Sequence, residues 1–436
     1  MAKLPFIDGL RNIVANLGTE RDKASQSHYV LQMPSDAELS AAYRTSATAR
    51  KVVDMPAEDM AREWREWQGN SDQIELIEAE EKRLGIQGKV MQAKIKARLF
   101  GGAAIYIGTG EQNGALPLNV RAIKKGGVKY LTVIPRTDLN AGEIETDPRL
   151  PGYGLPRFYT IGVSQDRIHP SRLVLMRGEE LPDDNMAGVQ QGWGDSSLAS
   201  CFTHVTNLDA VVANVVSLTY EANVDVVGIK GFNDGLKSFG EEYEKRAIQR
   251  ASLQARGKGI NGMLMIDADD TYNRKSASFA TLPDLMDRFM QLVSAASSIP
   301  VTRLFGISPG GMNATGESDE KVYTDRIKSM QTLELEPALS VLDECLIQSA
   351  LGSRPAEIFY NWRPLYVPSF KERSENAERM AKAFQLLNDM NLLPAEVLSE
   401  TLVNVFTELG VSPGLQGAVD KYFKPTGETD LSEGED

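Results

Sequence analysis

Residues 311–318 come close to a nucleotide-binding motif. Their sequence, GMNATGES, differs from the phosphate-binding pattern GxxxxGK[ST] at one position. In that pattern a lysine contacts the β- and γ-phosphates, but this chain has Glu317, whose negative charge would repel them. The pattern also requires a strand before the loop, and the sequence predicts none there. We therefore expect no nucleotide at this loop and no cofactor elsewhere in the chain.

Side chains that commonly bind zinc or act as a general base are few. The chain has three histidines and two cysteines, namely His28, His169, His204, Cys201 and Cys345. Their positions lack the paired spacing of zinc ligands, and two distant cysteines do not make a disulfide framework. We expect two buried thiols, a core histidine at His204 and a turn at His169. A Ser-His-Asp triad stays open, since its members can come from any part of a fold.

Three acidic residues lie close enough in sequence to bind a cation together, namely Asp267, Asp269 and Asp270. An EF-hand loop would also need a central glycine and a glutamate at its twelfth position. This stretch has neither, so it predicts a solvated turn and no metal site.

The charge of the chain is unusual for a protein that holds nucleic acid. Its 436 residues carry a formal net charge of −13, whereas proteins that neutralise phosphates are generally basic. Two interpretations stay open: the protein makes no contact with nucleic acid, or it contacts DNA without holding it. An acidic wall would suit the second, because it limits attraction to a passing duplex. The sequence predicts neither a signal peptide nor a membrane-spanning run of about 20 apolar residues.

The glycine-rich loop is predicted to connect two helices. The helix before it should stop at Ile299, because a residue that precedes proline, here Pro300, avoids the helical conformation. The loop itself is rich in Gly, Pro, Ser and Asn, which is typical of exposed functional loops. A long helix then begins near Ser318 and continues to about Leu351, with an interruption at Pro337. At 1.5 Å per residue it would be roughly 45–50 Å long.

Earlier in the chain, capping residues and apolar spacing predict three helices. Ser35 can cap a helix over residues 36–46. Apolar residues at helical spacing predict a core-facing helix over residues 50–67, with a stop at Pro56. Residues 71–92 are charged and predict a further helix.

Residues 94–108 are predicted to change from helix to strand at Gly101 and Gly102. Glycine commonly ends helices, and the apolar run AAIYI that follows favours a strand. Further strands are predicted at residues 128–133, 158–161 and 173–176. Asp195 or Ser196 can cap the next helix, which has a wide apolar face over residues 198–222.

Residues 223–280 form a separate compositional unit between two apolar helices. We expect a strand at 224–230, a charged helix at 241–256 and a second strand at 263–266. The apolar helix after this unit covers residues 282–298. Beyond the long helix, two short strands are predicted around Trp362, followed by helices at 374–388 and 394–409.

Several stretches of the sequence resemble the portal proteins of tailed bacteriophages. They are RKVVDMPAEDMAREW at 50–64, ARLFGGAAIYIG at 97–108, IHPSRLVLMRGEELP at 168–182, GWGDSSLAS at 192–200 and PVTRLFGISPGGMNATGESD at 300–319. The resemblance covers roughly residues 35–410. It implies an α+β, mainly helical portal fold with wing, stem, clip and crown regions, in which identical subunits form a ring.

The resemblance also implies how the chain is divided. The expected regions are the first part of the wing with an N-terminal arm (1–197), stem helix 1 (198–222), the clip (223–280), stem helix 2 (281–299), the tunnel loop (300–318), the second part of the wing (319–368), the crown (369–423) and a disordered acidic tail (424–436). Because the C-terminal part is short, an extended crown barrel is an open question.

In the portal family about twelve subunits form a ring at one capsid vertex, and DNA passes through its centre. The resemblance therefore implies a non-enzymatic channel for DNA packaging and ejection, located in the virion and assembled in the host cytoplasm. The implied partners are further copies of the chain, the terminase large subunit, a head–tail adaptor, the major capsid and scaffolding proteins, and double-stranded DNA recognised without sequence specificity. No membrane partner is implied.

In such a ring, copies of the glycine-rich loop would line the narrowest part of the channel. The residues implied to lie there are Arg303, Ile307, Ser308, Pro309, Gly310, Gly311, Met312, Asn313 and Lys321. Arg303 and Lys321 could contact phosphates briefly, whereas the residues between them would present small apolar and amide surfaces. Two alternatives stay open: a phage-encoded hydrolase with an unrecognised site, and another scaffold protein of the head–tail junction.

Overall fold

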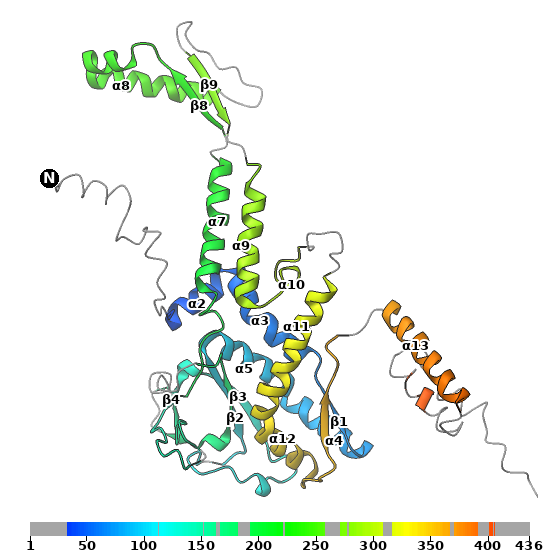
Figure 1. Cartoon of the computed structure of the whole chain (residues 1–436). Coiled ribbons are helices and arrows are strands. Elements are labelled where there is room, and N and C mark those ends of the chain that lie inside the picture. Colours follow the sequence, from blue (N-terminus) through cyan, green and yellow to red (C-terminus); the bar gives the residue numbers. More distant parts are fainter. Residues whose placement is uncertain are drawn as a thin grey trace, which may run out of the picture. The chain divides into compact units, whose positions relative to one another are not determined.

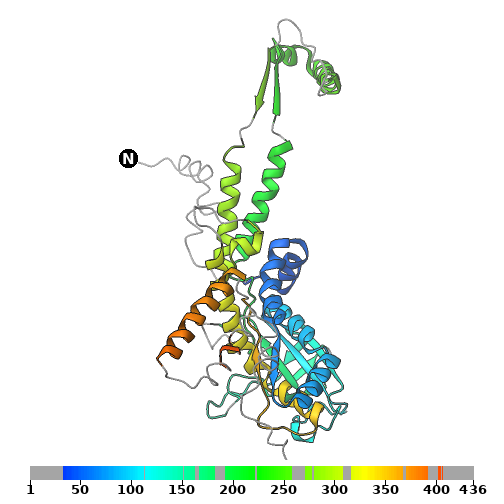
Figure 2. The ribbon, with the colours of Figure 1, turned by 90° about the vertical axis from the view of Figure 1, so that its right-hand side faces the viewer.

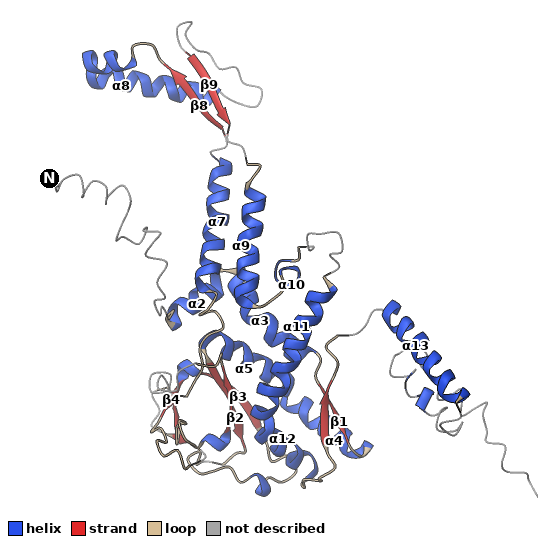
Figure 3. Ribbon diagram, viewed as in Figure 1, coloured by secondary structure: helices blue, strands red, loops and turns tan. Residues whose placement is uncertain are grey.

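The structure is a computed structural model of the 436-residue chain. It describes residues 33–111, 113–150, 152–162, 166–181, 192–220, 223–257, 271–276, 279–307, 316–366, 370–390, 401–403 and 405. The chain divides into two units, Met1–Trp362 and Arg363–Asp436. The described residues are mainly helical and also form four small sheets, so the expected α+β class is confirmed (Figure 3).

The helices of the larger unit are labelled in Figure 1. They are α2 (Asp36–Thr45), α3 (Ala47–Arg62), α4 (Ser71–Leu84), α5 (Ile86–Phe100), α7 (Phe202–Tyr220), α8 (Phe232–Gly257), α9 (Leu282–Ser297), α10 (Val301–Phe305), α11 (Glu317–Met330) and α12 (Glu336–Leu351). The strands are β1 (Arg65–Gln68), β2 (Gly102–Gly108), β3 (Tyr130–Pro135), β4 (Leu139–Ala141), β5 (Tyr159–Ile161), β6 (Arg167–Ile168), β7 (Leu173–Arg177), β8 (Asn223–Gly228), β9 (Thr271–Ser276) and β10 (Phe359–Trp362).

The first two helices begin at serine caps. The Ser35 hydroxyl accepts a hydrogen bond from the backbone of Glu38, and the Ser35 backbone donates at 2.8 Å to the Glu38 carboxylate. This reciprocal capping box confirms the predicted start of α2. The next helix, α3, begins in the same way, because the Ser46 hydroxyl accepts from the backbone of Ala49.

Helix α3 continues through Pro56, so the predicted stop at this residue is wrong. Proline has no N–H and cannot bond the carbonyl oxygen of Val52, four residues earlier. The guanidinium of Arg98, on α5, instead donates at 3.1 Å to the carbonyl oxygens of both Val52 and Val53. A side chain thus replaces the missing backbone donor, and the helix extends to Arg62.

The predicted helical spacing over residues 50–67 does not extend to its two tryptophans. Trp64 follows the end of α3, and Trp67 lies on strand β1. Strand β1 pairs antiparallel with β10, which places Trp67 opposite Tyr360. The structure has one strand around Trp362 where two were predicted. Its partner comes from a distant part of the chain, which local patterns do not indicate.

Glycines in the left-handed conformation separate α4, α5 and β2. Residues 71–92 do not form the single predicted helix, because Gly85 (φ 63°) ends α4 and starts α5. At the other end of α5, Gly101 (φ 82°) turns the chain directly into β2. The predicted change from helix to strand at the paired glycines is therefore confirmed.

The central sheet has the strand order β3-β2-β7, and both pairings are antiparallel. Ile105 on the middle strand is opposite Val133 on one side and Val174 on the other. The three strands predicted over residues 128–133, 158–161 and 173–176 all exist, although β3 is displaced by two residues. Helix α5 packs against this sheet, which places Arg98 beside α3.

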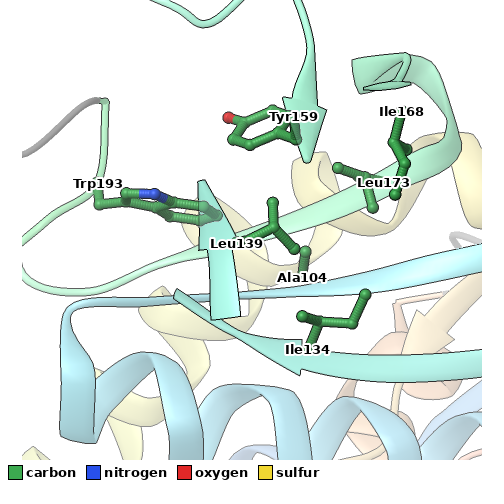
Figure 4. Close-up of a cluster of buried hydrophobic side chains, with 7 residues drawn as sticks. All are labelled: Ala104, Ile134, Leu139, Tyr159, Ile168, Leu173 and Trp193. Carbon is green, nitrogen blue, oxygen red and sulfur yellow. The ribbon is translucent and has the colours of Figure 1, made fainter. Parts of the chain in front are cut away.

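A buried apolar cluster joins the central sheet to a second sheet of order β4-β5-β6. Its members are Ala104, Ile134, Leu139, Tyr159, Ile168, Leu173 and Trp193 (Figure 4). The Trp193 ring lies so close to Gly102 that a Cβ atom there would be 2.3 Å from a ring carbon. Glycine at this position is therefore required for the tryptophan to pack.

Helices α7 and α9 lie side by side, as two perpendicular views agree (Figures 1 and 2). Helix α7 begins at Phe202, four residues after the predicted start, because residues 197–201 form turns. The Ser196 hydroxyl accepts from the backbone of Leu198 within these turns. Helix α9 closely follows its predicted range and ends at Ser298, whose φ of 55° reverses the chain before Pro300.

The segment between α7 and α9 contains β8, α8 and β9. Strands β8 and β9 pair antiparallel, with Val226 opposite Asn273. The described partner of β8 thus lies at residues 271–276, in a polar stretch where no strand was predicted. The predicted strand at 263–266, like Asp267, Asp269 and Asp270, lies outside the described residues. Helix α8 is longer than predicted and contains one non-helical residue, Gly240.

The predicted long helix consists of α11, a π-helical segment (Gln331–Leu335) and α12. It begins at Glu317 and ends at Leu351, close to the expected positions. The predicted interruption at Pro337 takes the form of the π-helical segment just before it, where the Glu336 backbone bonds the Gln331 carbonyl oxygen. A widened turn is a common way to accommodate a residue that cannot donate to the preceding turn.

In the smaller unit, α13 (Phe370–Asp389) includes the helix predicted over residues 374–388. Its buried side chains include Ala377 and Phe384. Of the second helix predicted there, over 394–409, the structure describes residues 401–403 and 405, which are helical. The predicted N-terminal arm up to residue 32 and the acidic tail at 424–436 lie outside the described residues.

Candidate functional site

The two helices that flank the glycine-rich loop are joined through one carboxylate, that of Asp59 on α3. Arg303, on α10 before the loop, donates from Nε to Asp59 Oδ2 at 3.1 Å and from Nη2 to Oδ1. Tyr323, on α11 after the loop, donates its hydroxyl to Asp59 Oδ2 at 2.9 Å. A side chain from a third helix therefore connects the segments on both sides of the loop.

Burial and charge keep the Tyr323 hydroxyl and the Arg303 guanidinium in the protonation states that these bonds require. Asp59 and Tyr323 are 6% and 5% exposed. Burial, together with the adjacent Asp59 carboxylate, raises the pKa of Tyr323, so its hydroxyl stays a donor. Burial lowers the pKa of Arg303, but the hydrogen bonds and charge of Asp59 outweigh this and leave that pKa raised. The Arg303 guanidinium also lies over the Tyr323 ring, 5.4 Å from its centre.

Further contacts hold the start of the loop against the neighbouring helices. Lys51, on α3, donates from Nζ to the Leu304 carbonyl oxygen at 2.8 Å, at the C-terminal end of α10. Leu304 and Ile299 are almost fully buried. Arg326, on α11, donates at 3.4 Å to the carbonyl oxygen of Ser298, where α9 ends. Helices α9, α10 and α11 are thereby connected around the base of the loop.

Left-handed glycines mark both ends of the loop. Gly306 (φ 71°) closes α10, and its N–H donates to the Thr302 carbonyl oxygen at 3.0 Å. Gly316 (φ 73°) precedes α11, and its carbonyl oxygen accepts from Glu320 at 3.0 Å. Glycine adopts this conformation without the steric cost that a Cβ atom brings. The chain can therefore leave one helix and enter the other abruptly.

Of the predicted loop residues, the structure describes Arg303, Ile307 and Lys321. Arg303 is engaged by Asp59, Ile307 is half-buried, and Lys321 is exposed on α11. The other predicted residues, 308–313, lie outside the described part of the chain. Asp59 and Tyr323 were not predicted from the sequence. The sequence contains one indication that Asp59 is special, because this acidic residue lies beside Met60 on the otherwise apolar face of α3.

A hollow of about 540 Å³ adjoins the pair formed by Asp59 and Arg303. Its wall also includes Glu58, Arg62 and Met91. Charges of both signs line it, and Arg62 Nη1 lies 3.6 Å from Asp59 Oδ1. Solvent therefore reaches the Arg303 side of the pair, in agreement with the 27% exposure of that side chain.

Residues 306–310, with the sequence GISPG, have the spacing of the G-x-S-x-G motif of α/β-hydrolases. In that motif the serine lies on a turn that leads from a strand into a helix. Here the residues follow helix α10, which Gly306 closes. The element before the motif is thus a helix and not the strand that a nucleophile elbow requires.

The other candidate residues occupy ordinary structural positions. Cys201 and Cys345 are the predicted buried thiols, and burial raises their pKa to about 11 and about 12. His169 caps a turn, as predicted, by accepting from the Ser171 backbone at 3.2 Å. His204 is half-buried on the first turn of α7, so the prediction of a core histidine is wrong.

The described residues offer neither a metal-binding cluster nor a membrane-spanning helix. No cluster of three or more His, Cys, Asp or Glu side chains in that part of the chain could hold a metal ion. Within the same residues, no helix combines the length and the apolar character needed to span a bilayer.

Comparison with known families gives a match over most of the chain. A family model described as phage portal protein matches residues 37–386. A protein of Caulobacter sp. (strain RHG1), named Anti-CBASS protein Acb1, is 38% identical over 440 residues, which covers 95% of this chain and 69% of that protein. An uncharacterized protein of Haemophilus influenzae is 29% identical, over 88% of this chain and 86% of its own length.

Two solved structures share the fold of this chain at low sequence identity. One is the neck of an empty GTA particle computed with C6 symmetry, with a TM-score of 0.51 and 16% identity over 92% of this chain and 99% of the other. The second is the neck of a native GTA particle computed with C12 symmetry, with a TM-score of 0.52 and 14% identity over 89% and 98%.

Proposed function

We propose, because the chain belongs to the phage portal protein family, that it forms a ring at one vertex of a phage or phage-like capsid and that DNA passes through this ring. About twelve copies would close the ring, each rotated by the same angle from its neighbour. The ring serves as a structural channel for DNA packaging and ejection and is a part of the virion. The terminase large subunit, a head–tail adaptor, and the major capsid and scaffolding proteins are its proposed partners.

The observation that carries this proposal is the match of the portal family model to residues 37–386. The surface of the helix pair α7 and α9 supports it. Val212 and Val216 on α7, and Leu285 and Leu292 on α9, are between 39% and 50% exposed. Apolar side chains that remain uncovered after two helices pair are suited to contact with neighbouring copies.

The regions of the portal fold are assigned to the elements as follows. Helices α7 and α9 form the stem, the segment from β8 to β9 forms the clip, and α13 belongs to the crown. The tunnel loop (300–318) includes α10 and the start of α11, and the remaining elements of the larger unit form the wing. Lys321, exposed at the start of α11, is the described residue proposed to meet DNA phosphates.

Electron microscopy of the purified protein tests the ring. End-on views should show an annulus with a central hole, and a twelve-copy assembly of 47.9 kDa chains would weigh roughly 575 kDa. A particle that stays below about six subunits at all concentrations would contradict the proposal and favour the enzyme alternative.

Deletion of residues 309–314 tests the role of the tunnel loop. Rings should still assemble, because the described contacts between wing elements do not involve these residues, but DNA packaging should stop. Removal of six residues from the acidic tail, 429–434, is the matched control and should leave packaging intact. Normal packaging by the loop deletion would show that the loop does not act in the channel, whereas loss of the ring would show that the loop is structural.

A second candidate function follows from the name of the Caulobacter relative, which matches 95% of this chain. That relative is named for activity against CBASS, and the match leaves part of its length uncovered. Expression of this chain alone in cells that carry a CBASS system separates the two candidates. Protection against CBASS by this chain would support the second function, and failure to protect would assign that activity to the uncovered part of the relative.

A further inference from the structure

Helix α10, which leads into the tunnel loop, is too short to hold its own position. It has five residues, and an isolated helix of this length is unstable in water. Its location therefore depends on contacts of its side chains and carbonyl groups. Those contacts are the burial of Leu304, the bond from Lys51 to the Leu304 carbonyl oxygen, and the pairing of Arg303 with Asp59.

Asp59 lies on a firmly packed helix and bonds the segments on both sides of the loop, so it can hold them in position. Its helix, α3, is firmly packed, with Val52, Val53, Ala57 and Met60 at most 1% exposed. Both carboxylate oxygens of Asp59 accept from Arg303, and Oδ2 also accepts from Tyr323. Arg303 lies three residues before Gly306, and Tyr323 lies on the second turn of α11. One rigid group thus contacts the chain where it enters the loop and where it leaves.

We infer that Asp59 is a positioning residue for the tunnel loop. By binding Arg303 and Tyr323 together, it fixes the position of α10 relative to α11, the two helices that flank the loop. This inference rests on the proposed function, because it gives the loop a place in a ring. Without the carboxylate, α10 loses its side-chain bonds to Asp59 and keeps the bond from Lys51, so the separation of α10 and α11 varies more widely.

A purely stabilising role would have different consequences, and a second aspartate of α3 offers the comparison. Asp54 accepts a hydrogen bond at 2.8 Å from the hydroxyl of Tyr43, on α2. It lies on the same helix as Asp59 and also bonds a tyrosine, but that tyrosine is on α2, which does not flank the loop. Replacing either residue with alanine removes a carboxylate–phenol contact, whereas only Asp59→Ala releases the loop.

Spin-label distances between loops in the assembled ring test the inference. The full-length chain with Asn313→Cys is labelled at that position; the native Cys201 and Cys345 are buried, and wild type treated with the same label gives the background. Asp59→Ala should widen the distribution of distances between labels about twofold, as expected when a local contact opens. Tyr323→Phe should widen it less, and Asp54→Ala should leave it unchanged.

An unchanged distribution in Asp59→Ala rings would overturn the inference, as would an equal widening in Asp54→Ala rings. If Asp59→Ala does not assemble, Arg303→Lys and Tyr323→Phe replace it, since each keeps the size of the side chain and removes part of the contact. Widening in either variant supports the inference, and its absence in both contradicts it.

Packaging by the same variants separates this inference from the proposed function. If the deletion of residues 309–314 leaves packaging normal while Asp59→Ala still widens the distances, the proposed channel role fails and the positioning of the loop stands. If the deletion blocks packaging but Asp59→Ala changes no distance, the channel role stands and the positioning role fails.

Discussion

The guanidinium of Arg98 supplies Val52 with the hydrogen bond that a proline four residues later cannot make. Nη2 of Arg98 lies 3.1 Å from the Val52 carbonyl oxygen, and Nε lies at the same distance from that of Val53. Arg98 is 6% exposed, and burial lowers its pKa, although the Glu179 carboxylate lies 3.5 Å from Nη1. This arrangement allows a proline inside a helix whose apolar face forms the core.

Replacement of Arg98 with methionine should destabilise the protein by about 3 kcal/mol, because the Val52 carbonyl oxygen loses its donor and that of Val53 loses a second one. The loss should be smaller in a Pro56→Ala background, where an alanine N–H can bond the Val52 carbonyl oxygen. Urea unfolding of the four variants of this cycle gives the coupling free energy. Equal losses in both backgrounds would contradict the proposed compensation.

Alanine at Gly101 should be far more harmful than alanine at Gly85. Both glycines end a helix with a left-handed φ, so each substitution has a conformational cost of about 1 kcal/mol. Gly85 has open space around it, whereas a Cβ atom at Gly101 would lie 2.2 Å from the Gly194 carbonyl oxygen. We expect an additional loss of about 2 kcal/mol or more at Gly101, measured by thermal unfolding. Similar losses at both positions would contradict this packing argument.

Asp343 should make the stability of the protein depend on pH. Its carboxyl pairs with Arg65 in a buried cluster with Glu81, and burial raises its pKa to about 6. The folded protein therefore binds this proton more tightly than the unfolded chain, and the associated stability is lost as the pH rises from about 4 to about 6. The difference between 3.8 and about 6 corresponds to about 3 kcal/mol at most.

The variant Asp343→Asn cannot titrate at this position and should lose this part of the pH dependence. Urea unfolding at several pH values between 4 and 7.5 measures the slope in both proteins. Parallel profiles for wild type and variant would show that Asp343 keeps its ordinary pKa in the folded state.

A lysine at Val216 should prevent ring assembly while leaving the subunit folded. Val216 is 47% exposed on α7, and a buried lysine at an apolar contact between copies would have no partner. Asn214→Lys is the matched control, because this exposed residue lies on a different side of the same helix. Light scattering after size-exclusion chromatography measures the assembly, and circular dichroism measures the fold. Rings of unchanged size in Val216→Lys would show that this face is not an interface.

The sequence alone determined those features that depend on a few neighbouring residues. Ser35 starts a helix because its hydroxyl reaches the backbone three residues later, and Gly101 ends one because glycine tolerates a left-handed turn. Pro300 follows the end of a helix because the residue before proline avoids the helical conformation. The stretches at 97–108 and 300–319 also resemble portal protein sequences closely enough to indicate the family.

Only the tertiary structure decided the features that depend on distant partners. Pro56 does not stop its helix, because Arg98 reaches it from α5, and Trp67 belongs to a strand, because β10 lies beside it. The role of Asp59 likewise depends on distant residues, because its partners Arg303 and Tyr323 lie more than 240 positions later in the chain. Local backbone preferences act over one or two turns. A buried hydrogen bond or strand pair, in contrast, depends on which segments the whole fold brings together.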